Sequence, residues 1–360
     1  MPFRTIFGHR RLLHLLSRSI ARGTLPQSLI FAGPDGVGKM RTAIAVAQAV
    51  NCLKPRIRDQ GSGIGGQGSI ASSDARLNDE LLLDACGECT ACRRIERGVF
   101  PDVLLIEAED TGAIKIEQVR AAIGETAFRP FEGRCRVAII DQADRLGADA
   151  QDALLKSLEE PPPRSMFILV SARSDTLAPT IRSRCARLRF GRLSPGEIAR
   201  ALTRDREYSE DTARKLAALA GGSVGRAIEA DAGSVDEVRA AACRTLRAVA
   251  SAADARVRLD GGRELVGERK AGSTAGADRE NLAARLTALL SVLRDLVILS
   301  TRANGEALAN LDLRAELEGL SRFYGRDRAA RAFAAADRAL WALRRNASTK
   351  IVADWLVLQL

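Results

Sequence analysis

Short apolar runs alternate with amphipathic segments over residues 1–190. The runs predict buried strands and the segments between them predict helices, because the spacing of apolar residues differs between the two. Strands are expected at 28–32, 103–107, 137–141, 167–171 and 187–190, and helices at 9–22, 39–51, 115–127 and 149–159. Strands that alternate with helices predict a mostly parallel, three-layer α/β domain over residues 1–192.

Beyond residue 192 the apolar spacing is that of helices alone. Ser194 and Pro195 are typical of a helix N-terminus and predict the start of a small helical domain over 193–232. A C-terminal helical domain is expected over 234–360, as a bundle of helices near 280–302, 306–320, 326–346 and 349–360. Gly-rich stretches interrupt the pattern twice, and they predict a flexible insertion at 53–85 and a loop at 258–279.

An eight-residue stretch that starts at Gly33 matches a phosphate-binding loop at every defined position but the last. Backbone amides around Gly33, Gly36 and Gly38 would cradle phosphates, and Lys39 would reach the outer ones. The pattern ends in Ser or Thr, whose hydroxyl holds Mg²⁺. Here Met40 offers a soft thioether instead, which Mg²⁺ does not favour. The loop therefore predicts descent from an ATPase whose own hydrolysis is in doubt.

The strand expected at 137–141 ends in Asp141, as in the Walker B pattern, whose Asp positions Mg²⁺. On its own, such an aspartate is better explained as the cap of a turn. Active ATPases of the AAA+ type usually have Glu at the next position, whereas this chain has Gln142, and an amide cannot take a proton from water. With Met40 and Gln142 both altered, we expect negligible hydrolysis. Because Lys39 and the glycine amides remain, weak binding of ATP is still expected.

Two later segments carry a family resemblance. Ala-Leu-Leu-Lys-Ser-Leu-Glu-Glu-Pro-Pro occupies residues 153–162, and Thr-Ile-Arg-Ser-Arg-Cys occupies residues 180–185. Together with the phosphate-binding loop and Asp141, they resemble the AAA+ subunits of sliding-clamp loaders. The resemblance spans residues 1–232 with several motifs in order, and beyond that it rests on length and helicity.

The resemblance implies an AAA+ P-loop domain with a parallel sheet, a helical lid over 193–232 and an all-α collar domain over 234–360. Met40 and Gln142 make the chain similar to the delta-prime class of the DNA polymerase III loader, whose nucleotide sites are commonly degenerate. The partners it implies are the tau/gamma and delta subunits, the sliding clamp, and primed DNA reached through the assembled complex.

In this family the Ser-Arg-Cys triplet carries an arginine finger that completes the ATP site of the adjacent subunit. The resemblance therefore assigns that role to Arg184, and a guanidinium stays charged and offers a fork of donors to a γ-phosphate. One surface arginine among many is the alternative. The family's first sensor position falls near Ser171. Arg226 lies one place later than the lid arginine of active relatives, so we assign it no contact.

Cys86, Cys89 and Cys92 have the spacing C-x2-C-x2-C, which fits tetrahedral Zn²⁺. A closed structural site needs a fourth ligand, and the family position for it is Cys52. An iron–sulfur cluster is the alternative. The insertion between Cys52 and Cys86 need not destroy the site, because the cost of closing a loop grows slowly with its length. The remaining cysteines are expected to act as small hydrophobic residues: Cys135, Cys185 and Cys243.

The formal net charge of +10 suits nucleic acid or an acidic partner protein, although an Arg-rich genome explains it equally well. With no signal peptide and no apolar run long enough to span a membrane, we expect a cytoplasmic bacterial protein. Two alternative functions remain. An active clamp-loader ATPase of the tau/gamma or small-subunit kind would turn over ATP in isolation. A zinc-bearing nucleic-acid-binding module would bind DNA tightly without partner subunits.

Overall fold

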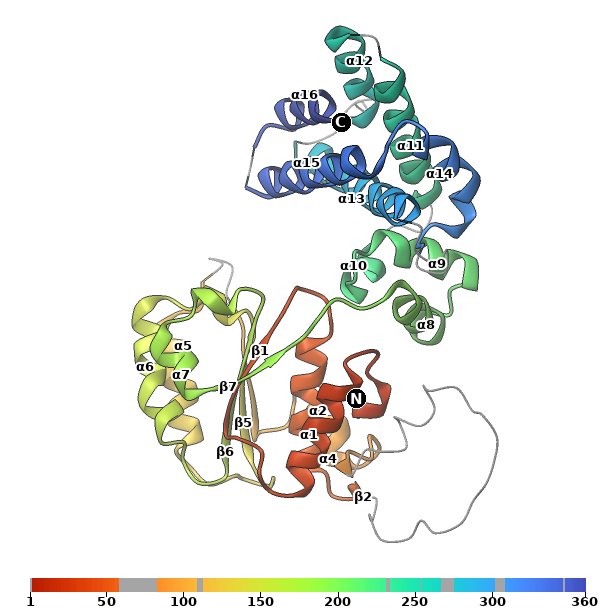
Figure 1. Cartoon of the computed structure of the whole chain (residues 1–360). Helices are drawn as coiled ribbons and strands as arrows, with labels where there is room; N and C mark the ends of the chain where they lie inside the picture. The colour runs from red at the N-terminus through yellow and green to blue at the C-terminus, as the bar shows by residue number, and fades with distance from the viewer. Residues whose placement is uncertain are drawn as a thin grey trace, which may run out of the picture. The chain divides into compact units, whose positions relative to one another are not determined.

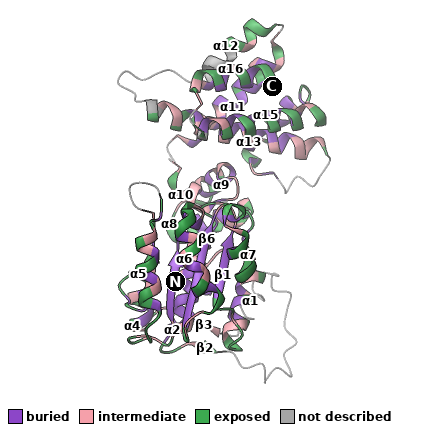
Figure 2. Ribbon diagram, turned by 90° about the vertical axis from the view of Figure 1, so that its left-hand side faces the viewer, coloured by how far each residue is buried: buried purple, intermediate pink, exposed green. Residues whose placement is uncertain are grey.

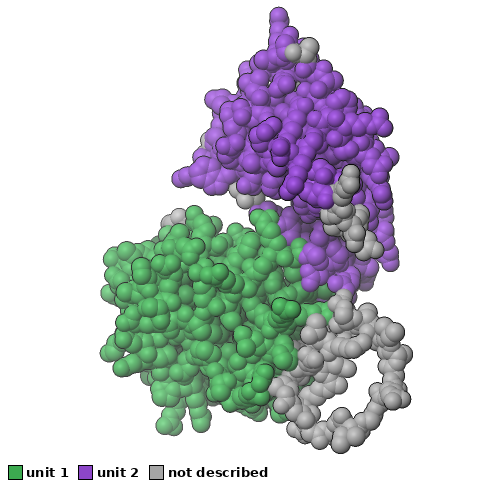
Figure 3. All heavy atoms as spheres, in the orientation of Figure 1, with its two compact units in different colours: residues 1–193 green, residues 194–360 purple. Residues whose placement is uncertain are grey.

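The computed structural model describes residues 2–57, 83–108, 113–230, 234–252, 254–266, 275–301, 308–345 and 347–360. Residue contacts divide the chain into two compact units, residues 1–193 and 194–360 (Figure 3). The end predicted for the α/β domain, residue 192, lies one residue before this division. Within the described ranges, none of the helices combines the length and the apolar character needed to cross a membrane.

A five-stranded parallel sheet forms the centre of the first unit (Figure 1). Its order is β4-β5-β6-β1-β7, with β1 Ser28–Ala32, β4 Val103–Ile106, β5 Arg136–Ile140, β6 Ser165–Ser171 and β7 Ala186–Arg189. All neighbouring strands pair in parallel, so their carboxyl ends meet at one edge of the sheet. β1, β5 and β6 are buried along their whole length, which explains their continuous apolar runs. The predicted parallel α/β fold is confirmed.

Helices cover both faces of this sheet (Figures 1 and 2). One face carries α1 Arg10–Ala21, α2 Lys39–Asn51 and α4 Thr90–Glu96, and the other carries α5 Ile116–Thr126, α6 Ala148–Glu159 and α7 Pro179–Arg184. Successive residues of β5 point to opposite faces. Ile139 joins the core formed with α1 and α2, and Ile140 joins the core formed with α5 and α6. The sheet is therefore the middle of three layers.

The insertion predicted at 53–85 is too wide. Strands β2 (Arg56–Ile57) and β3 (Leu83–Asp84) form a two-stranded antiparallel sheet. Ser17 holds β3 in place, because its hydroxyl donates to the carbonyl of Leu83 at 2.7 Å and accepts from the amide of Leu83 at 2.9 Å. The remainder of the predicted insertion, residues 58–82, lies outside the described residues. The shorter elements of the first unit are the 3-10 turns η1 Phe3–Thr5, η2 Ala143–Arg145 and η3 Ser174–Thr176.

The second unit is helical over its described residues (Figure 1). Ser194 caps the first helix as predicted: its hydroxyl accepts the amide of Glu197, and the Glu197 carboxylate accepts the amide of Ser194. A core of leucine and alanine side chains joins the C-terminal helices. The helices are α8 Pro195–Arg206, α9 Glu210–Leu219, α10 Val224–Glu229, α11 Val235–Ser251, α12 Ala255–Val266, α13 Ala275–Ser300, α14 Arg314–Ser321, α15 Arg326–Arg344 and α16 Thr349–Gln359.

The loop predicted at 258–279 is wrong at both ends, where α12 and α13 supply helix. Leu265 explains the first error, because it is 1% exposed in the leucine core and its burial outweighs the low helix propensity of the glycines. Residues 267–274 lie outside the described part of the chain. The helix predicted at 306–320 starts only at Arg314, after the 3-10 turn η5 Leu311–Leu313.

A buried polar network explains the late start of α14. The carboxylate of Asp295 on α13 accepts the backbone amides of Ala309 and Asn310, so these residues are held outside a helix. The Asn310 side chain accepts the guanidinium of Arg239, which is 1% exposed on α11. Ser291 on α13 receives the Asn310 amide group and donates to the backbone carbonyl at position 218 on α9. The network thus joins α9 to the C-terminal helices.

Candidate nucleotide site and metal centre

The phosphate-binding loop joins the carboxyl end of β1 to the start of α2. Gly36 and Gly38 have φ angles of 70° and 101°, where a side chain would be strained. At Gly33 a Cβ would lie 2.2 Å from the carbonyl oxygen of Phe190, so only glycine fits there. The structure therefore explains all three glycines by backbone geometry. The amide of Gly33 donates to the carbonyl of Ser171 at 3.2 Å, whereas Gly36 and Gly38 lie just before the N-terminus of α2, which is a favourable place for an anion.

The amine of Lys39 contacts the backbone of the phosphate-binding loop. Its Nζ donates to the carbonyls of Gly33 and Pro34, each at 2.6 Å, and lies 3.7 Å from a carboxylate oxygen of Asp35. Burial lowers the pKa of the Lys39 amine, while the nearby carboxylates of Asp35 and Asp141 oppose that shift. A phosphate bound to this loop would have to compete with the two carbonyls for the amine.

The two altered positions lie beside the same loop. Met40 is half-buried and packs against the core formed with α1 and α2, and its thioether side chain has no oxygen that could bind a metal ion. Asp141 follows β5 and accepts the backbone amide of Gln142 at 2.9 Å. Burial raises the pKa of the Asp141 carboxyl, which the Gln142 amide and Lys39 partly offset. The Gln142 side chain is exposed, on a residue with a φ angle of 48°.

Asp144 also lies at this site, although no role was predicted for it. Its Oδ1 accepts the hydroxyl of Ser171 at 2.9 Å and the amide of Ala172 at 3.1 Å, and its Oδ2 lies 3.4 Å from Nε of Arg173. Burial alone would raise the pKa of Asp144, but these donors lower it overall. The predicted sensor position, Ser171, is therefore bonded to the segment that follows β5. The available signal was that both strands end at the same edge of the sheet.

Arg184 is the last residue of α7 and one third of its side chain is exposed. Its guanidinium lies against the carboxylate of Glu159 and the backbone carbonyl of Thr180. The neighbouring thiol, Cys185, is buried in the core. Arg226 lies in the second unit on α10, where its backbone amide donates to the hydroxyl of Ser223. The role of Arg184 as an arginine finger stays a prediction.

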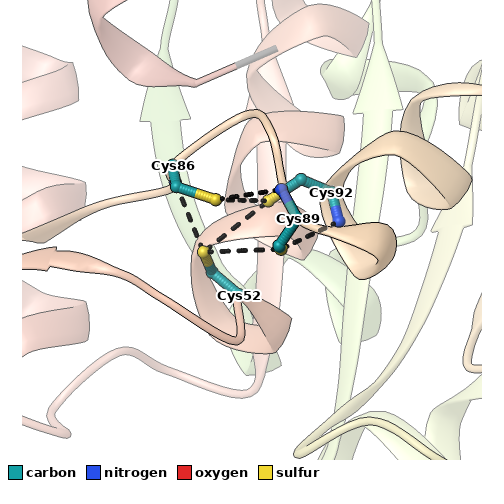
Figure 4. A group of neighbouring side chains, drawn as sticks. All are labelled: Cys52, Cys86, Cys89 and Cys92. Carbon is teal, nitrogen blue, oxygen red and sulfur yellow. Dashed lines mark hydrogen bonds between the residues drawn. The ribbon is translucent and has the colours of Figure 1, made fainter.

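Cys52, Cys86, Cys89 and Cys92 come together at the end of α2 and the start of α4 (Figure 4). All four sulfur atoms lie within 4.8 Å of one another. The sulfur of Cys52 lies 3.6 Å from that of Cys92 and 4.0 Å from that of Cys89, and Cys86 and Cys92 are 3.9 Å apart. Four thiolates bound to one tetrahedral zinc at about 2.3 Å would lie about 3.8 Å apart. The group therefore has the dimensions of a single-metal site, with no room for a larger cluster.

Backbone amides favour the thiolate forms. The amides of Glu88 and Cys89 donate to the sulfur of Cys86, and the amide of Cys92 donates to that of Cys89. Burial alone would raise the pKa of the Cys89 thiol, but the amide of Cys92 and other donors lower it to about 6. Burial raises the pKa values of the Cys52 and Cys92 thiols, so the amides favour the thiolate of Cys89 most clearly. Since a metal takes thiolates, these amides support metal binding.

The segment around the cysteines is fixed by contacts beyond the sulfur atoms. The guanidinium of Arg4 donates to the carbonyls of Ala85 and Cys86, both at 2.7 Å, and pairs with the Asp84 carboxylate at 3.1 Å. Gln48 donates to the carbonyl of Cys92 at 2.7 Å. Such outer contacts orient ligands and are common around metal sites. They were not visible in the sequence, because Arg4 is eighty residues from its partners.

The other three cysteines lie outside this group. Cys185 and Cys243 are buried, and Cys135 is half-buried. Burial raises the pKa of Cys135 to about 11 and the pKa values of Cys185 and Cys243 to about 12. At neutral pH they are protonated thiols, which agrees with their interpretation as small hydrophobic residues.

A comparison with known proteins gives a family match and several relatives. The family model described as DNA polymerase III, delta subunit, matches residues 69–194. The delta' subunit of Bacillus subtilis DNA polymerase III is 31% identical over 61% of this chain and 58% of its own length. The tau/gamma subunit of Haemophilus influenzae is 31% identical over 62% of this chain and 29% of its own length. The chain thus spans less than two thirds of either relative.

Among solved structures, a gamma subunit-related protein of DNA polymerase III from Thermotoga maritima aligns with 96% of this chain and 96% of its own, at 16% identity and a TM-score of 0.39. So low a score adds nothing to the fold described above. The sequence matches are what carry the assignment, and both the delta' and the tau/gamma classes are among them. These matches support a member of the clamp-loader family of DNA polymerase III subunits, delta'-like or tau/gamma-like.

Proposed function

We propose that this chain is a delta'-like subunit of a DNA polymerase III clamp loader, which helps to place the sliding clamp on primed DNA. One observation carries the proposal: the position that should bind Mg²⁺ is Met40, packed against the core, while Arg184 stands exposed at the end of α7. A chain with these features can stimulate a neighbour's ATP hydrolysis without performing its own. Its partners are then the tau/gamma and delta subunits, the clamp and primed DNA.

Its own nucleotide site binds ATP weakly and does not turn it over. The amides of Gly36 and Gly38 and the amine of Lys39 remain to hold phosphates. The thioether of Met40 and the amide of Gln142 replace the metal-binding hydroxyl and the acid that hydrolysis needs. Gln142 can orient a water but cannot accept its proton.

The four cysteines hold one zinc ion in a structural role. Four thiolates close the coordination sphere, so no position is left for water or substrate. Cys52 follows α2 and Cys92 lies in α4, so the metal would join the phosphate-loop helix to the segment that starts at β3. Any contacts of the chain with DNA would be to its phosphates. Their affinity would fall as the salt concentration rises and would not depend on the DNA sequence.

The test is a loader reconstituted from this chain and its tau/gamma and delta subunits. Arg184→Ala should fold and assemble normally, yet lower clamp-dependent ATPase and clamp loading by about a hundredfold, less than the loss of a finger elsewhere because other sites in the ring keep theirs. Arg184→Lys should rescue poorly, because a point charge does not reproduce the planar fork.

The alternative is an active tau/gamma-like ATPase, which the similarity to tau/gamma subunits favours. If Arg184→Ala loads clamps at the wild-type rate while Lys39→Ala abolishes loading, the chain is a motor subunit and the proposal is overturned.

A further inference from the structure

Glu159 binds the guanidinium of Arg184 along one edge. Nε of Arg184 lies 3.2 Å from Oε2 of Glu159, and the NH2 group donates to Oε1 at 3.3 Å. On the opposite side, the NH1 group donates to the carbonyl of Thr180 at 3.2 Å. A bidentate contact of this kind fixes the plane of the guanidinium as well as its position. The arginine is therefore held in one geometry by α6 on one side and by its own helix on the other.

The contacts leave the end of the guanidinium open. Each terminal nitrogen of an arginine carries two N–H groups. In the described part of the chain, one N–H of NH1 and one of NH2 are engaged, and the second N–H of each has no acceptor. These two groups form the outer fork, the edge that binds a phosphate with two parallel hydrogen bonds.

The presence of a glutamate at position 159 is not explained by the stability of α6. It is the last residue of that helix, where the macrodipole disfavours a negative charge. Its side chain is 57% exposed and pairs with Arg184 alone among the described residues. Glu160 follows directly, is also an exposed glutamate, and its side chain forms no hydrogen bond or ion pair among the described residues. Of the two adjacent carboxylates, only that of Glu159 contacts Arg184.

We propose that Glu159 is a positioning residue that presents the outer fork of Arg184 to the phosphate of a nucleotide bound by a neighbouring subunit. This role rests on the proposed function of Arg184 as an arginine finger. A free arginine loses its rotamer freedom when it binds, whereas this one is ordered before contact. The carboxylate takes the inner edge, so the donors that a γ-phosphate needs stay available.

The first test is kinetic and uses the reconstituted loader. Glu159→Gln should lower kcat of the clamp-dependent ATPase about two- to fivefold, the range for an exposed ion pair, and leave KM for ATP unchanged. Glu160→Gln is the matched control and should leave both constants unchanged. In an Arg184→Ala background, Glu159→Gln should have no further effect, because residues that act through one group are not additive.

Three outcomes would overturn the role of Glu159 without contradicting the arginine finger. They are a loss of kcat in Glu159→Gln that adds to that of Arg184→Ala, an equal loss of kcat in Glu160→Gln, and a rise of kcat in Glu159→Gln. A rise would mean that the carboxylate competes with the phosphate. An unchanged rate in Arg184→Ala would instead overturn the finger itself, so the two failures are told apart.

The second test needs no partner. In the ¹⁵N-labelled full chain, the Nε–H resonance of Arg184, assigned by its loss in Arg184→Lys, should be protected from exchange with water. Glu159→Gln should remove that protection and Glu160→Gln should keep it. Equal exchange in all three proteins would show that the pair is not formed in solution and would overturn the proposal.

Discussion

Replacement of one cysteine in the four-thiolate group tests the metal centre most directly. Cys89→Ser is the best perturbation, because Cys89 is the least buried of the four and a hydroxyl leaves almost no cavity in its place. The hydroxyl can still cap α4, where the sulfur accepts the amide of Cys92. The substitution therefore removes a metal ligand and little else. Purified wild-type chain should contain about one zinc per molecule, and Cys89→Ser close to none.

The stability effect can be worked from the structure. Apart from the half-buried Cys89, the core around the cysteines consists of four buried residues: Cys52, Ala85, Cys86 and Cys92. So small a core depends on its metal. At free zinc a hundredfold above Kd, binding stabilises the folded state by about 2.7 kcal/mol. For a unit of this size, each kcal/mol shifts Tm by about 2–4 °C, so Tm of the first unit should fall by about 5–11 °C.

The assay can separate the two units. Both tryptophans of the chain, Trp341 and Trp355, lie in the second unit, so their fluorescence follows that unit alone. Calorimetry should show the first unit unfolding earlier in Cys89→Ser, while the tryptophan transition stays where it is. Cys135→Ser is the matched control and should keep its zinc. Wild-type protein without zinc, or iron in its place, would refute the reasoning, and so would a Cys89→Ser variant that keeps a full complement of metal.

Three further outcomes are expected. In a steady-state assay the isolated chain should hydrolyse ATP no faster than its Lys39→Ala variant, whereas turnover lost on that substitution would indicate a working site. Asp102→Ala should destabilise the first unit by about 3 kcal/mol in urea unfolding at pH 7, because the buried guanidinium of Arg136 loses its buried carboxylate partner and keeps only the exposed carboxylate of Glu125. Burial alone would raise the pKa of Asp102, but three backbone amides and Arg136 lower it overall. The ionised carboxylate therefore stabilises the fold at neutral pH, and this stabilisation is lost as pH falls through the lowered pKa. At pH 3 the difference in unfolding free energy between Asp102→Ala and wild type should be smaller. Arg239→Leu should lower the urea midpoint of the tryptophan transition by the equivalent of about 2 kcal/mol, because the Asn310 carbonyl oxygen loses its donor.

Much of the first unit could be predicted from the sequence, because its strands are continuous apolar runs and its helices follow the 3.6-residue period. The errors lie where tertiary contacts outweigh local signals. The glycines near residue 261 predict a loop, yet the burial of Leu265 draws the segment into α12. Asp295 holds residues 309 and 310 out of a helix that the pattern predicts.

In the candidate site, too, local motifs could be predicted from the sequence and long-range contacts could not. Motifs with fixed spacing, such as the phosphate-binding loop, could be located directly. The contact of Glu159 with Arg184 spans twenty-five residues and joins two helices, so only the fold reveals it. Asp144 and Arg4 were missed for the same reason.

The pairing of β2 with β3 has a practical consequence. Ile57 and Leu83 lie opposite each other in antiparallel register, so the two ends of the intervening twenty-five residues are neighbours. Residues directly opposite in such a pair have Cα atoms about 5 Å apart. A two-residue Asn-Gly turn could therefore replace the segment, since it closes an antiparallel hairpin. The same junction could accept a fluorophore or an affinity tag, which would label the chain beside the four cysteines without altering α2 or α4.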